Sequence, residues 1–126
     1  MLRELRGMGV FCAMVYLQEA HADDLWPLGY GIRSHVTLED RIGACRDFLT
    51  RHSEFGAALD SLTLDGMKDE FLHTFGAWPM RYFVSDLTGN ITWSSDAMDL
   101  QAHTPEDVSK LYDRVREQLR VGTPAV

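Results

Sequence analysis

Residues 10–17 read VFCAMVYL, and this stretch decides the predicted fold because it is the longest apolar run of the chain. Apolar side chains at consecutive positions give a strand two apolar faces, which is typical of a central strand in a sheet covered on both sides. Polar residues follow at once in QEAHADDLW, residues 18–26, where Glu19 and His21 stand two positions apart. Residues two apart on an extended strand point to the same face. We therefore expect Glu19 and His21 to lie together at the carboxyl end of this strand, where open α/β sheets build their sites.

The segments on either side of this strand have the signals of helices. Residues 1–8 read as the last turns of a helix, which two glycines end. Residues 19–36 form a long connection, and a second helix is predicted from Leu38 to about Arg51, with Thr37 as its N-cap. Its predicted inward face consists of Leu38, Ile42, Cys45, Phe48 and Leu49.

A short strand, a helix and a hairpin are predicted next. Residues 57–64 read as the strand, and Asp65 is the predicted N-cap of a helix that runs through Phe75. The inward side chains of this helix are predicted to be Met67, Phe71, Leu72 and Phe75. Residues 80–86 and 90–95 are predicted to form a hairpin around the turn LTG.

The last predicted element is a helix. Thr104 is its predicted N-cap, and Pro105 occupies the first helical position. Its predicted buried stripe consists of Val108, Leu111, Val115 and Leu119. Residues 122–126 are predicted to be a flexible tail.

The order α-β-α-β-α-β-β-α predicts the fold class. Strands separated by helices favour parallel pairing, and the final hairpin adds an antiparallel edge. This pattern is similar to a thioredoxin-like α/β fold, with a central mixed sheet flanked by helices, that lacks its first strand and nucleophile loop. We expect one such domain over residues 1–121. Pro79 directly precedes the hairpin, where thioredoxin-like folds have a cis-proline near the redox centre.

Composition excludes several classes of function. The chain has 126 residues, of which 45% are hydrophobic and 25% charged, and its net charge of −7 argues against nucleic-acid binding, which needs a basic face. No apolar run approaches the ~20 residues of a membrane span, and the charged start lacks a signal-peptide core. We therefore expect a soluble, cytoplasmic chain, with an upstream membrane anchor left open.

The two cysteines, Cys12 and Cys45, form neither a CxxC motif nor a zinc-type spacing. Cys12 lies within the apolar run, and Cys45 falls in a helical pattern. Both are expected to be small buried residues rather than catalytic thiols.

Two stretches, YLQEAHADDLWPL and IRSHVTLEDRIGACRDFL, together resemble the iodothyronine deiodinases. That family has a Y-x-x-E-A-H stretch, a D-x-W shortly after, and a His a few residues before an L-E-D-R helix start. The matching positions are Tyr16, Glu19, Ala20, His21, Asp24, Trp26, His35, Leu38, Glu39, Asp40 and Arg41. The resemblance continues more weakly through FGAW and MRYFVSD to the final helix.

The resemblance implies an oxidoreductase that removes iodide reductively from an iodothyronine or a related iodinated phenol. Glu19 and His21 would then form a proton relay with Tyr16 as their neighbour, whereas His35 and Trp26 would contact the substrate. A His can hold and release a proton near neutral pH, and a carboxylate can orient its ring. A thiol reductant would be the co-substrate, with no other cofactor and no metal.

The chain also departs from the family. The nucleophilic Cys or selenocysteine is expected before residue 1, Met80 stands where the family often has a second acid, and SSDAMD has no Arg for a substrate carboxylate. Three hypotheses follow: a truncated deiodinase-like enzyme, an inactive binding module whose open sheet edge is covered by a partner or a second copy, and a thiol peroxidase or disulfide reductase.

Structural alternatives stay open for each site residue. Glu19 and His21 can form a surface ion pair, and His35 can be an ordinary loop or cap residue. A metal site would require His21, Asp23, Asp24 and His35 to converge. The tryptophans, Trp26, Trp78 and Trp93, are most simply core anchors, and the remaining histidines, His52, His73 and His103, are expected at the surface.

Overall fold

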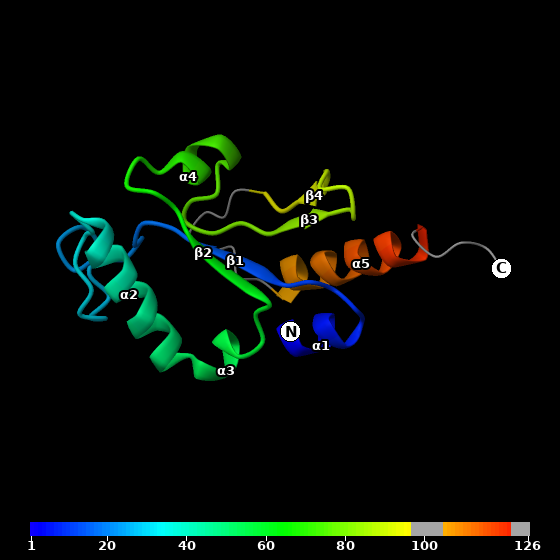
Figure 1. Cartoon of the computed structure of the whole chain (residues 1–126), viewed down its shortest axis with the longest axis horizontal. Coiled ribbons are helices and arrows are strands. Elements are labelled where there is room, and N and C mark those ends of the chain that lie inside the picture. Colours follow the sequence, from blue (N-terminus) through cyan, green and yellow to red (C-terminus); the bar gives the residue numbers. More distant parts are fainter. Residues whose placement is uncertain (97–104, 122–126) are drawn as a thin grey trace. The chain divides into compact units, whose positions relative to one another are not determined.

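The computed structural model describes residues 1–96 and 105–121, and only the backbone of 105–107. The elements are α1 (Leu2–Gly7), β1 (Ala13–Tyr16), α2 (Leu38–Arg51), α3 (Ser53–Gly56), β2 (Ser61–Leu64), α4 (Glu70–Phe75), β3 (Phe83–Ser85), β4 (Ile91–Ser94) and α5 (Pro105–Val121) (Figure 1). The chain divides into two compact units, Met1–Ala77 and Trp78–Val126. Each unit is described here by itself.

The first unit is built on a pair of parallel strands. Ala13 of β1 lies opposite Ser61 of β2, and the pairing continues to Tyr16 opposite Leu64. In the view of Figure 1 this pair lies to the right of α2 and below α4. The parallel pairing that the alternation of strands and helices predicted is confirmed.

Strand β1 is shorter than predicted. It begins at Ala13 rather than at residue 10, because the amide of Cys12 donates to the carboxylate of Asp60 (2.8 Å) instead of entering the ladder. Phe11 is 71% exposed, so the predicted burial of both faces is wrong at this position. Cys12 itself is buried as expected. The run's apolar character therefore extends beyond the paired strand.

Helix α2 starts where the sequence predicted, with a capping box. The amide of Asp40 donates to the hydroxyl of Thr37 (3.2 Å), and the amide of Thr37 donates to the Asp40 carboxylate (2.8 Å). The predicted inward position of Leu38 is wrong, since its side chain is 44% exposed. Arg41, one turn later, is the buried side chain of the first turns instead.

The segment after β2 differs from the prediction. Helix α4 begins at Glu70 and not directly after Asp65, because residues 66–69 form a turn first. Met67 lies in this turn and is 37% exposed, so its predicted inward position is wrong. Asp65 still caps the helix from a distance: its buried carboxylate accepts from the amides of Phe71 (3.0 Å) and Leu72 (2.9 Å).

The second unit contains the predicted hairpin. Strands β3 and β4 pair antiparallel, with an irregularity between Val84 and Ser85. Gly89 takes the left-handed conformation that the turn requires (φ 90°). The peptide bond between Trp78 and Pro79 is cis, as predicted.

Helix α5 confirms part of its predicted stripe. Leu111 and Val115 are buried, and Val108 is half-buried. Leu119 is 38% exposed because it lies in the last turn, so its predicted burial is wrong. The predicted N-cap at Thr104 and the tail 122–126 fall outside the described residues.

The architecture is mixed α/β with small sheets flanked by helices. The described strands form one parallel pair, β1–β2, within the first unit and one antiparallel pair, β3–β4, within the second. The single central mixed sheet stays a prediction. Across residues 1–96 and 105–121, no helix has both the length and the apolar character that a membrane crossing needs.

Replacing Asp65 by Asn is expected to lower the free energy of unfolding by about 1–3 kcal/mol. The Asn amide nitrogen cannot accept, so one of the two α4 amides that Asp65 binds loses its partner. Urea unfolding measures the change, and Asp47→Asn on the exposed face of α2 is the matched control. Equal stability of the two variants would contradict the capping role.

The hairpin turn should depend on the ionised carboxylate of Asp86. The carboxylate accepts from the hydroxyl and amide of Thr88 and from the amide of Asn90, which lowers its pKa to about 2. Because this pKa lies below the ordinary value of 3.8, the stabilisation is present above about pH 4 and is lost as pH falls through about 2. NMR should show faster hydrogen exchange of the Thr88 and Asn90 amides in Asp86→Asn. An ordinary pKa for Asp86 in the unmodified chain would contradict the dependence of the turn on this carboxylate.

Candidate active site

Polar side chains gather where β1 ends. Tyr16 is the last residue of the strand, and its hydroxyl donates to Oε2 of Glu19 at 3.1 Å. The chain leaves the strand after Tyr16 and turns, which returns Glu19 to the side of the tyrosine. Tyr16, which the resemblance implied as the neighbour of a Glu19–His21 relay, is therefore in direct contact with Glu19.

The ring of Tyr16 connects this pair to a histidine of the following loop. The rings of Tyr16 and His35 are stacked, with centroids 6.3 Å apart and an interplanar angle of 27°. Phe48 of α2 packs against the same tyrosine at 6.1 Å. Burial raises the pKa of Tyr16, and the neighbouring Glu19 raises it further. Tyr16 consequently keeps its proton at neutral pH and is a donor.

His35 is held from the other side by Arg41. The guanidinium Nε of Arg41 donates to Nδ1 of His35 at 3.3 Å. Burial lowers the pKa of His35, and the charge of Arg41 lowers it further, whereas the nearby carboxylates of Glu19, Asp40 and Asp69 oppose this. The imidazole is therefore neutral at pH 7.

His21 lies in a separate contact. Its ring meets Trp26 edge-on, with centroids 4.7 Å apart. In the described part of the chain no hydrogen bond or ion pair joins Glu19 to His21. The expectation that both point to one face of a strand is wrong, because β1 ends at Tyr16 and both residues lie beyond its end.

The connection between β1 and α2 is tied to itself and to the helix. The amide of Asp23 donates to the carbonyl of Ile32, and the amide of Ser34 donates to Oδ1 of Asp24, both at 2.7 Å. Arg51 Nη1 donates to the carbonyl of Tyr30 at 3.0 Å. These bonds give the long loop a fixed path near the cluster.

The tied loop presents apolar side chains to the surface. Its exposed apolar residues are Leu25, Trp26, Leu28, Tyr30 and Val36. Trp26 is 42% exposed and Trp78 41%, so the interpretation of these two as core anchors is wrong, since neither lies in a helix or strand. Trp26 is thus exposed and in contact with His21.

Arg41 is the residue that sequence reasoning missed. It is 1% exposed and belongs to the LEDR stretch, but a charged residue in a helix is ordinarily assigned to the solvent face. The available signal was its position: it lies four residues before Cys45, on the apolar side of the helical pattern.

The remaining site candidates have clear positions. Cys12 and Cys45 are buried, and this burial is the main reason that the pKa of each thiol is raised. Neither cysteine therefore has the environment of a reactive thiolate. Pro79 belongs to the second unit, and its role near the site stays a prediction. No three His, Cys, Asp or Glu side chains within residues 1–96 and 108–121 are placed to hold a metal ion. His52 and His73 are exposed as expected, whereas His103 is not among the described residues.

Because His35 is neutral in the folded chain, the free energy of unfolding is expected to depend on pH. Its pKa in the folded chain is below the ordinary 6.5, so the unfolded chain binds more protons between the two values. Stability should therefore be full above about pH 6.5 and fall as pH drops below it. Chemical unfolding at pH 7.5 and 5.5 measures this loss. It should shrink in His35→Gln but persist in the control His73→Gln, whereas identical losses in both variants would contradict the assignment.

Comparison with known families tests the resemblance that the motifs suggested. The sequence model of the iodothyronine deiodinase family matches residues 8–114. This range includes the whole cluster from Tyr16 to Arg41, both strand pairs and most of α5. Since the match spans most of the 126 residues, the chain belongs to the iodothyronine deiodinase family.

Proposed function

We propose that the protein is a deiodinase-like oxidoreductase that removes iodide from an iodothyronine or a related iodinated phenol. Membership of the deiodinase family supports this reaction class. The single observation that carries the proposal is the contact of the Tyr16 hydroxyl with the Glu19 carboxylate, beside the stacked ring of His35. Proton-holding groups collected in this way suit the protonation of a carbon atom.

The reaction balances with two thiols or one thiol and a selenol. A thiolate or selenolate attacks the iodine, the carbon–iodine bond breaks, and the ring carbon takes up one proton. The sulfenyl or selenenyl iodide then reacts with a second thiolate, which releases iodide and leaves a disulfide or a selenenyl sulfide. The attacking group is one other than Cys12 or Cys45, because both are buried with raised pKa values.

The geometry favours a revised division of roles. Glu19 acts with Tyr16 and His35 as the proton-holding group, since these three are in contact or stacked. His21 and Trp26 form an aromatic pair that can flank a substrate ring. This moves His21 from the relay to a substrate contact and adds His35 to the proton-holding group.

A thioredoxin-like arrangement is part of the proposal. It is supported by the parallel β1–β2 pair, the β3–β4 hairpin and the closing helix α5, which follow one another in the expected order.

Glu19→Gln is expected to reduce iodide release about 10²-fold, because general acid–base groups contribute at least that much. The assay uses the native protein, an iodothyronine substrate and dithiothreitol as reductant. Tyr16→Phe should also lower the rate, since it removes the hydroxyl that binds Glu19. Glu70→Gln, at an exposed position of α4, is the matched control.

Two outcomes would reject the proposal. Consumption of peroxide or of a disulfide without release of iodide would identify a thiol peroxidase or disulfide reductase. Binding of iodinated phenols without any turnover would identify a non-catalytic binding module. Unchanged iodide release in Glu19→Gln would contradict the role assigned to the cluster, but not the proposed reaction.

A further inference from the structure

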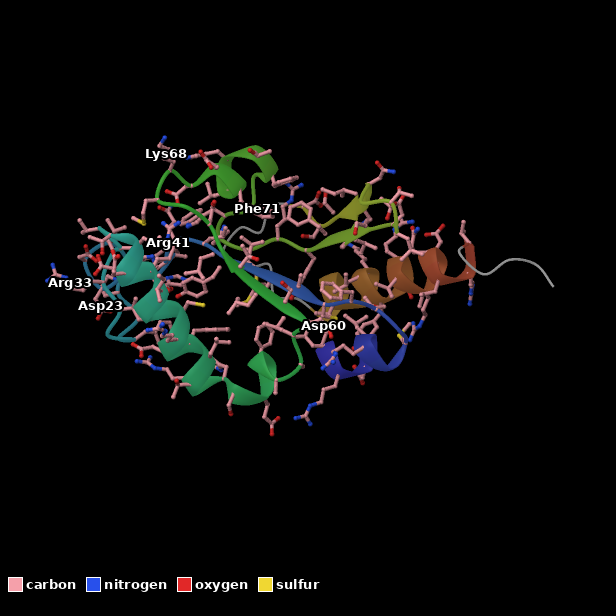
Figure 2. The ribbon with its side chains drawn as sticks, in the orientation of Figure 1. Asp23, Arg33, Arg41, Asp60, Lys68 and Phe71 are labelled. Atoms are coloured by element: carbon pink, nitrogen blue, oxygen red, sulfur yellow. The ribbon has the colours of Figure 1, made fainter. Side chains whose placement is uncertain are left out.

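Each of the three guanidinium nitrogens of Arg41 has a partner. Nη1 donates to the carbonyls of Asp65 (3.0 Å) and Gly66 (2.8 Å), and Nη2 pairs with Oδ1 of Asp69 (2.9 Å). The third nitrogen, Nε, donates to Nδ1 of His35. Figure 2 shows Arg41 on the side of α2 that faces the segment between β2 and α4. The backbone after β2 thus fixes the direction in which Nε–H points.

This contact determines where His35 carries its proton. Arginine stays protonated in proteins, so its Nε always donates. A ring nitrogen that accepts this bond has no proton of its own, and the single proton of neutral imidazole must then be on Nε2. Nε2 is itself buried and has no hydrogen-bond partner in the part of the chain that the structure describes.

We propose that Arg41 is a positioning residue that fixes His35 as the Nε2–H tautomer and so presents a hydrogen-bond donor to an acceptor oxygen of the ligand. The ligand's identity as an iodinated phenol rests on the proposed function; the tautomer does not. The phenolic oxygen of such a compound is an acceptor of the required kind. Tyr16, stacked on His35, has its own proton directed to Glu19, so the two rings offer different donors.

The arrangement has a chemical reason beyond packing. A buried N–H without an acceptor costs free energy, which an arriving acceptor recovers. A protonated His35 would lose the Arg41 bond, because both nitrogens would then be donors. The charged groups that act on His35 are Arg41 on one side and the carboxylates of Glu19, Asp40 and Asp69 on the other. Arg41 therefore selects a neutral donor where those carboxylates favour a cation.

Nitrogen NMR of the histidine-labelled protein tests the tautomer directly, without substrate. We expect the His35 signals of a proton-free Nδ1 and a protonated Nε2 at pH 7.5. In Arg41→Lys, whose ammonium cannot reproduce the guanidinium contacts, the two tautomers should mix and the pKa of His35 should rise. The signals of the exposed His52 and His73 serve as internal references in each spectrum. A wild-type His35 protonated at Nδ1, or an unchanged tautomer in folded Arg41→Lys, would overturn the proposal.

A second measurement uses variants of His35 and leaves Arg41 in place. It therefore tests the proposal even if Arg41→Lys does not fold. The probes are 3,5-diiodophenol and 1,3-diiodobenzene, which lacks the oxygen. His35→Gln retains a donor near the Nε2 position, whereas His35→Asn can only replace Nδ1. We expect the phenol to bind His35→Asn about tenfold more weakly than His35→Gln, as for one lost hydrogen bond, with no such difference for the benzene. Equal phenol affinities of the two variants would contradict the donor role of His35. If NMR shows the expected tautomer but the protein releases no iodide, only the proposed function is rejected.

Discussion

The buried guanidinium of Arg41 is the interaction on which the rest of the site depends. A buried charge is tolerated only when it is paired and hydrogen-bonded, and here two backbone carbonyls, the Asp69 carboxylate and a His35 nitrogen meet that condition. These partners come from the loop before α2 and from the turn after β2. Arg41 therefore connects helix α2 to the loop that follows β1 and to the turn that follows β2.

The cluster that results contains groups with different proton states. Tyr16 keeps its proton because it is buried and next to Glu19, whereas His35 is neutral because it is buried and next to Arg41. A donor directed at a carboxylate and a neutral imidazole with a free Nε2–H thus lie side by side. Family membership gives this arrangement its proposed use, which is to supply and place a proton during reductive loss of iodide.

Local signals in the sequence were sufficient for much of the fold. The capping box at Thr37, the hairpin around Gly89 and the parallel pairing of β1 with β2 are all decided by short segments or by element order. The start of β1 was missed because a tertiary bond between Cys12 and Asp60 determines it.

The sequence offered Tyr16, Glu19, His21 and His35 as candidates but did not indicate how these residues group. The alternation rule applied to Glu19 and His21 failed because the strand stops at Tyr16, and no sequence spacing indicates that a chain will turn there. Arg41 was missed for a related reason: its burial depends on carbonyls that lie 24 and 25 residues away in the chain.

The most direct test of this grouping is a pair of double-mutant cycles in the free energy of unfolding, which needs no substrate. Glu19→Ala is combined with Tyr16→Phe in one cycle and with His21→Ala in the other. The account predicts a coupling of about 1 kcal/mol between Glu19 and Tyr16, as for one hydrogen bond, and a coupling near zero between Glu19 and His21. Strong coupling of Glu19 to His21 without coupling to Tyr16 would contradict it.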